Sequence, residues 1–474
     1  MHSSINNINM IKSSPTPLRI AIIAHSLYPI TEPYAGGLEK MTHLICDELV
    51  DKGHEVLLYA HKDSQTKATL VPLMTDEEFD NIIGDQGPKN LSMGREELFS
   101  YLAYQMAFRD IIERDERGEI DIVHNHSLHH IPMMTGQVFG PRFFTTFHTP
   151  MFPALHLALV TLKLGTSTQF TSVSKYQQQL FSEYVPSHVV YNGIDVDQFK
   201  ANLEPISDEV YFWYGRICPE KGTHLAIQYC QQANKKLIIA GPKSNQCYFD
   251  DYVKPLLDQD ANLKDTDRLL NYVGHLTKSE VNQYLPQVTA MLFTSTWDEP
   301  YGLTLAESLA CGTPVLGFDA GASSEIITPE TGVIVPKEDS EAFIRGFEII
   351  KLISRKACRD RAVEFCSSTP MVEGYLDLYY RTLQQIQYPP FEISNLRSEQ
   401  SNEQSSSFKT SSFRLRSSQL NVTQFDVSNA KQSKSVHSKS TAWQNMIDSP
   451  NNNSIKSDHV LEAANLTDMT LSKE

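Results

Sequence analysis

The sequence predicts an α/β protein of two doubly wound Rossmann-like domains with a cleft between them, followed by a disordered tail. Short apolar runs, typical of buried parallel strands, alternate with amphipathic helical segments in two series, residues 17–195 and 207–368. Each series opens with a strand, a glycine-containing loop and a helix, the order in which a doubly wound α/β domain begins. A chain of 474 residues is also too long for a single ordinary core.

The first series opens with an apolar run from Arg19 to His25 that ends in a polar loop. Gly36 and Gly37 lie in this loop, and an amphipathic helix is expected from Leu38 to Lys52. Residues 76–118 have a charged, mostly helical pattern. Further strands are expected at residues 55–60, 121–124, 142–147, 172–174 and 189–191.

The second series predicts strands at residues 210–214, 236–240, 270–273, 290–293 and 314–317. Thr369-Pro370 interrupts the helical pattern, so one more helix is expected over residues 371–388. Residues 395–474 are rich in Ser, Asn, Gln and Lys and contain few large apolar side chains. This composition predicts a disordered tail.

The charge balance restricts the partners that the protein can have. Residues 1–190 contain 14 basic and 21 acidic residues, residues 191–390 contain 18 and 27, and the remainder is balanced. Such acidic domains argue against nucleic acid and against docking on anionic lipid, so no stable membrane association is expected. Seven scattered cysteines without a C-x-x-C pair, a polar N-terminus and the lack of long apolar runs predict a cytoplasmic protein.

The most informative segment runs from Thr294 to Glu307, where a Pro-Tyr-Gly turn stands between a strand and a helix. Backbone N–H groups at such a helix start favour an anion or a sugar oxygen. They belong to Tyr301, Gly302, Leu303 and Thr304. Glu299 precedes the turn, and Glu307 is expected in the first helical turn. Carboxylates beside an anion-binding turn predict a ligand with hydroxyl groups next to phosphates, such as a nucleotide sugar.

Three other loops carry candidate chemistry at predicted strand ends. Arg216 and Lys221 follow strand 210–214 and could neutralise a diphosphate, although a solvated surface pair is the alternative. Gly36 and Gly37 allow close backbone approach to a phosphate, or they are ordinary loop glycines. His148 could hydrogen-bond a sugar hydroxyl, or it is a satisfied loop histidine.

Two sequence patterns resemble metal-ligand motifs, but we favour other roles for both. The cluster of His124, His126, His129 and His130 has no carboxylate or cysteine close by in sequence, so cleft-lining or loop histidines are favoured. Asp195-Val-Asp197 follows Asn192-Gly-Ile and favours a structural turn. We therefore expect no metal and no cofactor, with the nucleotide sugar acting as a substrate.

Taken together, the motifs resemble the retaining glycosyltransferases of family 4 (glycosyl transferases group 1), which have the GT-B fold. The resemblance covers about residues 17–388. It is carried by residues 36–40, 121–124, 190–195, 215–222, 298–307 and 310–314.

The resemblance implies a role for each candidate residue. Glu299, with the amides of residues 301–304, would hold the transferred sugar, and Glu307 would bind the ribose hydroxyls. Arg216 and Lys221 would clamp the diphosphate, with the Gly36-Gly37 loop meeting it from the other domain.

His148 would lie beside the donor sugar, and Gly274 and His275 would border the nucleobase. The helix at residues 371–388 would cross back to the first domain.

The function implied is transfer of a hexose from a nucleotide sugar, in this family commonly a uridine nucleotide, with retention of anomeric configuration and without a metal. The acceptor cannot be read from the sequence, although the acidic first domain favours a soluble one. Alternatives are a GT-B-fold epimerase or phosphorylase, or a scaffold that acts through its tail. An epimerase would need acid/base carboxylates in place of the diphosphate clamp, and a phosphorylase would need a pyridoxal-binding lysine.

Overall fold

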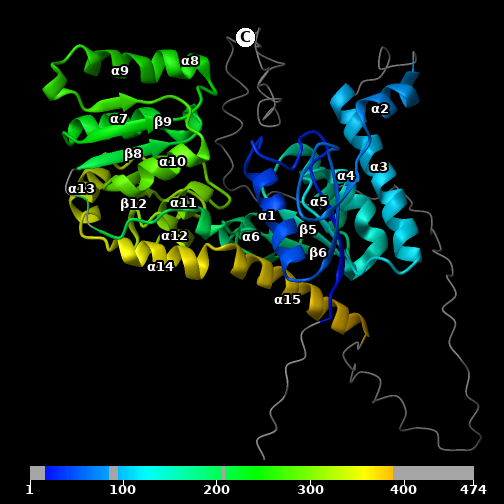
Figure 1. Cartoon of the computed structure of the whole chain (residues 1–474). Helices are drawn as coiled ribbons and strands as arrows, with labels where there is room; N and C mark the ends of the chain where they lie inside the picture. Colours follow the sequence, from blue (N-terminus) through cyan, green and yellow to red (C-terminus); the bar gives the residue numbers. More distant parts are fainter. Residues whose placement is uncertain (1–15, 85–93, 205, 207–208, 388–474) are drawn as a thin grey trace, which may run out of the picture. The chain divides into compact units, whose positions relative to one another are not determined.

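The computed structural model describes residues 16–84, 94–204, 206 and 209–387, which form two parallel sheets (Figure 1). The first sheet has the strand order β3-β2-β1-β4-β5-β6-β7. Its strands are β1 (Arg19–Ile23), β2 (Glu55–Ala60), β3 (Thr69–Pro72), β4 (Ile122–Asn125), β5 (Phe143–Phe147), β6 (Gln169–Ser172) and β7 (His188–Val189).

The second sheet has the strand order β10-β9-β8-β11-β12-β13. Its strands are β8 (Val210–Tyr214), β9 (Lys236–Ala240), β10 (Leu270–Tyr272), β11 (Ala290–Phe293), β12 (Val315–Phe318) and β13 (Gly332–Val335). Neighbouring strands run parallel in both sheets. These are the two doubly wound domains that the sequence predicts.

Helices connect the strands and pack against the sheets (Figure 1). In the first series they are α1 (Gly37–Asp51), α2 (Asp76–Ile83), α3 (Arg95–Glu116), α4 (His130–Thr135), α5 (Pro153–Leu162) and α6 (Lys175–Phe181). The second series contains α7 (Thr223–Gln232), α8 (Gln246–Tyr248), α9 (Lys254–Ala261), α10 (Lys278–Tyr284), α11 (Leu303–Ala310), α12 (Ser323–Ile326), α13 (Ser340–Ile350), α14 (Arg355–Phe365) and α15 (Ser368–Gln387).

The strands predicted at residues 55–60, 210–214, 236–240 and 290–293 are confirmed with the same bounds. β6 begins about three residues earlier than the strand that the sequence predicts. The sequence does not predict β3 and β13, because they are short and only partly buried. The helix expected to begin after Pro370 begins at Ser368, since proline in a first turn removes an N–H that has no helical partner. The predicted disordered tail, residues 395–474, lies outside the described residues.

The last helix, α15, follows the second series in the chain but packs against the first sheet (Figure 1). Met371, Val372, Tyr375 and Tyr379 of α15 share a hydrophobic core with strand β1 and helix α1. The Tyr379 hydroxyl also lies 2.5 Å from Nδ1 of His124. The two series are therefore joined by this helix as well as by the linker before β8.

Each sheet reverses its strand order at one place, between β1 and β4 in the first sheet and between β8 and β11 in the second. In doubly wound sheets the connections leave opposite faces at this point and open a crevice beyond the carboxyl ends of the strands. The loops that follow β8 and β11 carry Lys221 and Glu299. The topology alone therefore places both side chains at a ligand-binding position.

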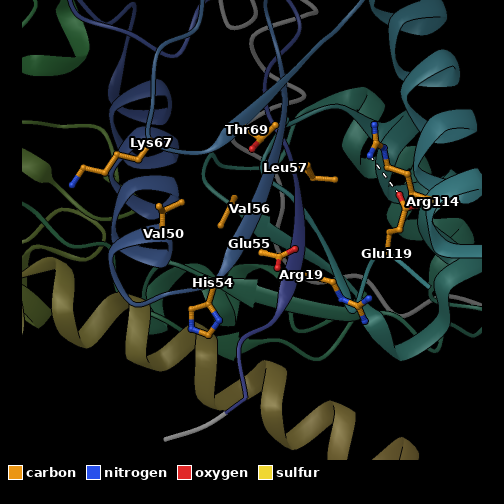
Figure 2. Close-up of a pocket in the computed structure, with 10 residues that line it drawn as sticks. All are labelled: Arg19, Val50, His54, Glu55, Val56, Leu57, Lys67, Thr69, Arg114 and Glu119. Atoms are coloured by element: carbon orange, nitrogen blue, oxygen red, sulfur yellow. Dashed lines mark ion pairs between the residues drawn. The ribbon is translucent and has the colours of Figure 1, made fainter. Parts of the chain in front are cut away.

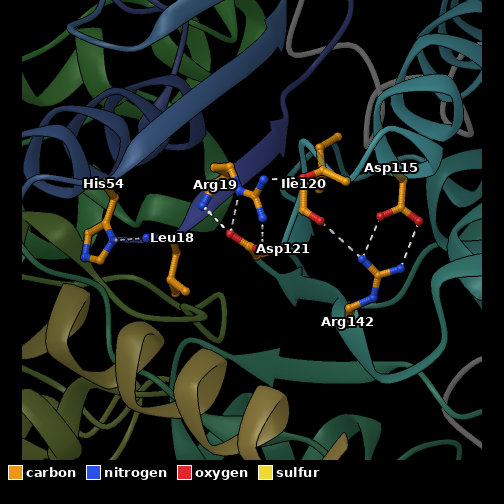
Figure 3. A network of polar contacts seen from close by, with 8 residues as sticks. Leu18, Arg19, His54, Asp115, Ile120, Asp121 and Arg142 are labelled. Atoms are coloured by element: carbon orange, nitrogen blue, oxygen red, sulfur yellow. Dashed lines mark hydrogen bonds and ion pairs between the residues drawn. The ribbon is translucent and has the colours of Figure 1, made fainter. Parts of the chain in front are cut away.

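Ion pairs stabilise the first sheet at the amino ends of its strands. Arg19 donates from its backbone N and Nε to Oδ2 of Asp121, at 2.8 and 3.0 Å, and Arg142 pairs with Asp115 at 2.7 Å (Figure 3). A cavity of about 660 Å³ also opens here (Figure 2). Its basic side chains are already paired, Arg114 with Asp110 and Lys67 with Asp51. We interpret the residues at the amino ends of these strands as structural.

Gly222, in the loop after β8, offers a test of how strictly this loop is constrained. Its φ is +65°, and a Cβ atom there would collide with the carbonyl oxygen of Thr294. We expect Gly222→Ala to lower the free energy of unfolding by about 2–4 kcal/mol, from left-handed strain plus the clash. Gly118→Ala is the control. Gly118 has φ +70°, and no atom of the described residues lies within 4 Å of a Cβ atom built there, so strain alone costs about 1–2 kcal/mol. Equal losses in urea denaturation would show that the Thr294 contact is soft.

Candidate functional site

The two loops at the switch point of the second sheet are tied together by hydrogen bonds. The Thr294 hydroxyl donates to the carbonyl oxygen of Gly222 at 2.9 Å, and the indole N–H of Trp213 donates to the Thr294 oxygen at 3.1 Å. The backbone N–H of Thr296 donates to the carbonyl oxygen of Glu220 at 2.9 Å. The loop that carries Lys221 is therefore fixed against the segment that carries Glu299.

Lys221 and Glu299 form an ion pair in this position. The Ser295 hydroxyl donates to Oε1 of Glu299 at 3.2 Å, and the backbone of Glu299 is bridged to Gly321. The two charged side chains are 23% and 14% exposed. A lysine and a carboxylate are thus held side by side with limited access to water, where electrostatic interactions are stronger than on an open surface.

Arg216 lies on the same loop as Lys221 but in a more open position. Its side chain is 48% exposed, and its guanidinium lies 3.6 Å from the carboxylate of Glu220. The structure therefore brings Lys221 and Glu299 together and leaves Arg216 at the solvent-exposed rim of the candidate site.

Helix α11 begins at the predicted turn. Gly302 precedes it with φ +96°, and no side chain among the described residues caps the helix start. Because the helix begins at Leu303, Glu307 is its fifth residue, so the expectation of Glu307 in the first turn is wrong. The Tyr301 side chain is buried in the hydrophobic core, so only its backbone groups are available to a ligand at the turn.

Glu307 has partners from both series of elements. Oε1 lies 2.5 Å from Nζ of Lys40, which belongs to α1, and the Tyr214 hydroxyl donates to Oε2 at 2.8 Å. Gly37 lies against the same helix, because a Cβ atom there would be 3.0 Å from Cδ1 of Leu303. The glycine loop of the first series and the carboxylate of the second are thus brought together.

The roles of Lys40 and Tyr214 are not evident from the sequence. Lys40 stands within the Gly36–Lys40 motif, but nothing local indicates that its amine reaches a carboxylate 267 positions away. A cavity of about 430 Å³ opens beside Lys40, and Lys278 also lines it. Burial and the nearby Lys40 charge lower the pKa of Lys278.

Contacts between glycine residues connect the loop with Gly274 and His275 to the loop after β8. Gly241, after β9, touches the carbonyl oxygen of Gly215 so closely that a side chain would not fit. Its N–H donates to the carbonyl oxygen of Gly274 at 2.8 Å. The loops after β8, β9 and β10 therefore lie side by side at one edge, with His275 exposed there.

His148 follows β5 at the carboxyl edge of the first sheet, and its Nε2 lies 2.9 Å from Nδ1 of His126. Burial lowers the pKa of His148 to about 3, so the ring is neutral at ordinary pH.

The nearby His124 is fully buried, and its Nε2 lies 2.7 Å from the Thr146 hydroxyl. His129 accepts from the backbone N–H of Ile131 with its Nδ1, so it caps α4.

Within the residues that the structure describes, no group of three or more His, Cys, Asp or Glu side chains is arranged to hold a metal ion. Asp195 accepts from the backbone N–H of Asp197 at 3.1 Å and from Nε2 of Gln198 at 2.6 Å. This pair is therefore a structural turn, as the sequence predicts.

Residues 35–198 match the family described as Glycosyltransferase Family 4, and residues 196–364 match Glycosyl transferases group 1. The two matches cover every strand of both sheets except β1, and they include each candidate loop described in this subsection. The chain belongs to this glycosyltransferase family. The glycosyltransferase has the GT-B fold and takes its sugar from a nucleotide-sugar donor.

The glycosyltransferase is similar to curated proteins with different reactions. It is 24% identical to the glycogen synthase of Mycobacterium tuberculosis over 361 residues, which cover 68% of this chain and 83% of that protein. It is 23% identical to the N-acetyl-alpha-D-glucosaminyl L-malate synthase of Bacillus anthracis over 390 residues, 74% and 95% of the two chains.

Solved structures show the same fold. Sucrose-phosphate synthase from Thermosynechococcus elongatus superposes with a TM-score of 0.58 at 18% identity, covering 77% of this chain and 99% of that one. The Anabaena protein HepE, in complex with UDP, gives 0.57 at 17% identity, with coverage of 77% and 100%. Among the described helices of the glycosyltransferase, none is both long and apolar enough to cross a membrane.

Three histidines at the carboxyl ends of the first sheet's strands predict how stability changes with pH. Burial holds the pKa values of His124, His126 and His148 below the unfolded value of about 6.5. Below pH 6.5 the unfolded chain takes up protons that the folded chain does not, so stability is complete above pH 6.5 and falls as the pH decreases. We expect each ring to contribute a loss of about 1 kcal/mol between pH 6.5 and 5.5.

The measurement is urea denaturation at both pH values. His148→Gln should show a decline smaller by about 1 kcal/mol than the unmodified protein. An unchanged decline would mean that the His148 ring takes up a proton as readily in the folded protein as in the unfolded chain.

Proposed function

We propose that this glycosyltransferase transfers a hexose from a UDP-linked donor to an acceptor hydroxyl with retention of anomeric configuration and without a metal ion. The observation that carries the proposal is the fixed Lys221–Glu299 pair beside the start of α11, one helical turn from Glu307. This arrangement offers a cation for phosphate, amides for oxygen atoms and two carboxylates for hydroxyl groups, all at a switch point.

In this proposal Glu307 binds the ribose hydroxyls of the donor. Its carboxylate is held by Tyr214 and Lys40, and each carboxylate oxygen retains acceptor capacity for a further hydrogen bond. The loop with Gly274 and His275 borders the nucleobase at the same edge.

Lys221 neutralises the diphosphate together with Arg216 and the free amides of the helix start. Arg216, which is half exposed and only loosely paired, is able to turn toward a bound phosphate. The Gly36-Gly37 loop supplies backbone from the first domain. These positive groups would do the work that a divalent ion does in other transferases, which is the support for a metal-independent reaction.

In the reaction, the bond between the sugar's anomeric carbon and the diphosphate oxygen breaks, and the departing diphosphate keeps the electron pair. The acceptor oxygen bonds to the anomeric carbon on the same face, and its proton passes to the diphosphate oxygen. Glu299 and the amides of residues 301–304 hold the sugar and stabilise charge near the reacting carbon. His148, neutral at ordinary pH, contributes a hydrogen bond or its backbone carbonyl. The protein supplies position and electrostatics and no covalent nucleophile.

The choice of a uridine nucleotide and a hexose is supported by HepE, whose solved structures contain UDP and UDP-glucose. We propose a soluble acceptor because the first domain is acidic. All seven cysteines of the chain are free thiols, six of them buried, which supports a reducing compartment such as the cytoplasm. The comparisons do not favour an epimerase, a phosphorylase or a scaffold.

A donor panel tests the proposed reaction. Purified protein is incubated with UDP-, GDP- and ADP-linked hexoses, and release of nucleotide is followed with and without EDTA. We expect slow hydrolysis of a UDP-hexose that EDTA does not change, with the α-anomer of the sugar seen first by NMR. Release of the opposite anomer would contradict retention, and activity that EDTA abolishes and magnesium restores would contradict metal independence.

Substitution of the ion pair tests the role assignment. We expect Glu299→Gln and Lys221→Met each to lower kcat about 10²–10³-fold, because each removes charge from the reacting centre. Glu209→Gln and Lys235→Met are matched controls, since this ion pair lies at the amino ends of β8 and β9. Near-normal turnover in either site variant would refute its role, and a similar loss in the controls would indicate a general folding defect.

A further inference from the structure

His126 lies immediately after β4, at the switch point of the first sheet, and its side chain is fully buried. Its Nδ1 is 2.9 Å from Nε2 of His148. Nothing in the described part of the chain forms a hydrogen bond with the other ring nitrogen, Nε2 of His126. The two rings therefore share one hydrogen bond, and within the described residues the buried Nε2 of His126 is left without a partner.

The unpartnered nitrogen indicates where the shared proton lies. If His148 donated from Nε2, the neutral His126 ring would have to carry its own proton on Nε2, as a buried N–H without an acceptor. If His126 donates from Nδ1, its Nε2 is a bare acceptor, which is the less costly of the two defects. The second arrangement also requires His148 to carry its proton on Nδ1.

We propose that His126 is a positioning residue that fixes His148 in the tautomer with the proton on Nδ1. His148 then presents an N–H donor, and not a lone pair, to an oxygen of the bound sugar or acceptor. The proposal rests on the proposed function for the role of His148, but the tautomer itself is a property of the free protein.

The surroundings of His126 hold its ring in place. The ring centroid lies 4.0 Å from that of His124 and 6.0 Å from that of Tyr375, to which it is nearly perpendicular. His124 is in turn held by Tyr379 and Thr146. Because Tyr375 and Tyr379 belong to α15, this helix supports the orientation of a side chain at the carboxyl edge of the first sheet.

The first test is spectroscopic and uses the full-length protein without substrate. In protein labelled with ¹⁵N-histidine, two-bond ¹H–¹⁵N correlations distinguish the two neutral tautomers, and the His148 signals are those lost in His148→Gln. We expect the His148 signals to show a protonated Nδ1 and a bare Nε2. The reverse pattern overturns the proposal, whatever the enzyme activity.

The second test compares two substitutions of His126. His126→Asn keeps an N–H donor close to the position of Nδ1, whereas His126→Leu removes it. We expect His126→Asn to retain the His148 tautomer and kcat within about threefold, and His126→Leu to lose the tautomer and about tenfold in kcat, the effect of one hydrogen bond. Equal kcat in the two variants, at equal melting temperature, overturns the proposal.

The two hypotheses can fail separately. If the His148 tautomer is as expected but His148→Gln transfers sugar normally, the role of His148 in the proposed function is wrong, and the inferred proton position stands.

Discussion

The hydrogen bonds of the buried Thr294 hydroxyl are the contact on which the candidate site depends. They join the loop after β8 to the segment after β11, two strands that are neighbours only because the sheet reverses its order there. Lys221 and Glu299 lie on two different loops, and these hydrogen bonds help to fix the two loops against each other. An ion pair, a helix start and a carboxylate share one edge of the second sheet.

Carboxylates of the second series also reach the first. Glu307 pairs with Lys40 of α1, and Glu325 of α12 accepts from the backbone N–H groups of Lys175 and Tyr176 at 2.9 and 2.8 Å. The Tyr191 hydroxyl donates to the same Glu325 carboxylate at 2.7 Å. Because Glu307 is also the proposed ribose ligand, the proposed donor contact and the contact with helix α1 of the first series involve the same carboxylate.

The histidines of the first sheet illustrate why residue type alone is a poor guide to chemistry. Four histidines lie within seven positions, yet His124 and His129 have structural partners, and His126 faces His148 from a different loop. Burial keeps the pKa values of His124, His126 and His148 low, so these rings act as neutral donors and acceptors. A sequence shows their spacing but not which ring nitrogen has a partner.

The sequence by itself determined the two parallel-sheet domains, the family and the turn between Glu299 and Glu307, because these features depend on local periodicity and on contiguous motifs. It misplaced the start of α15 and missed β3 and β13, where local patterns are weak. Only the tertiary structure decided that Glu307 pairs with Lys40 and Tyr214, that Arg216 lies at the rim, and that His126 holds His148. The contacts of Glu307 and His126 join residues 22 to 267 positions apart, and the exposure of Arg216, like their geometry, follows from how strands and helices pack.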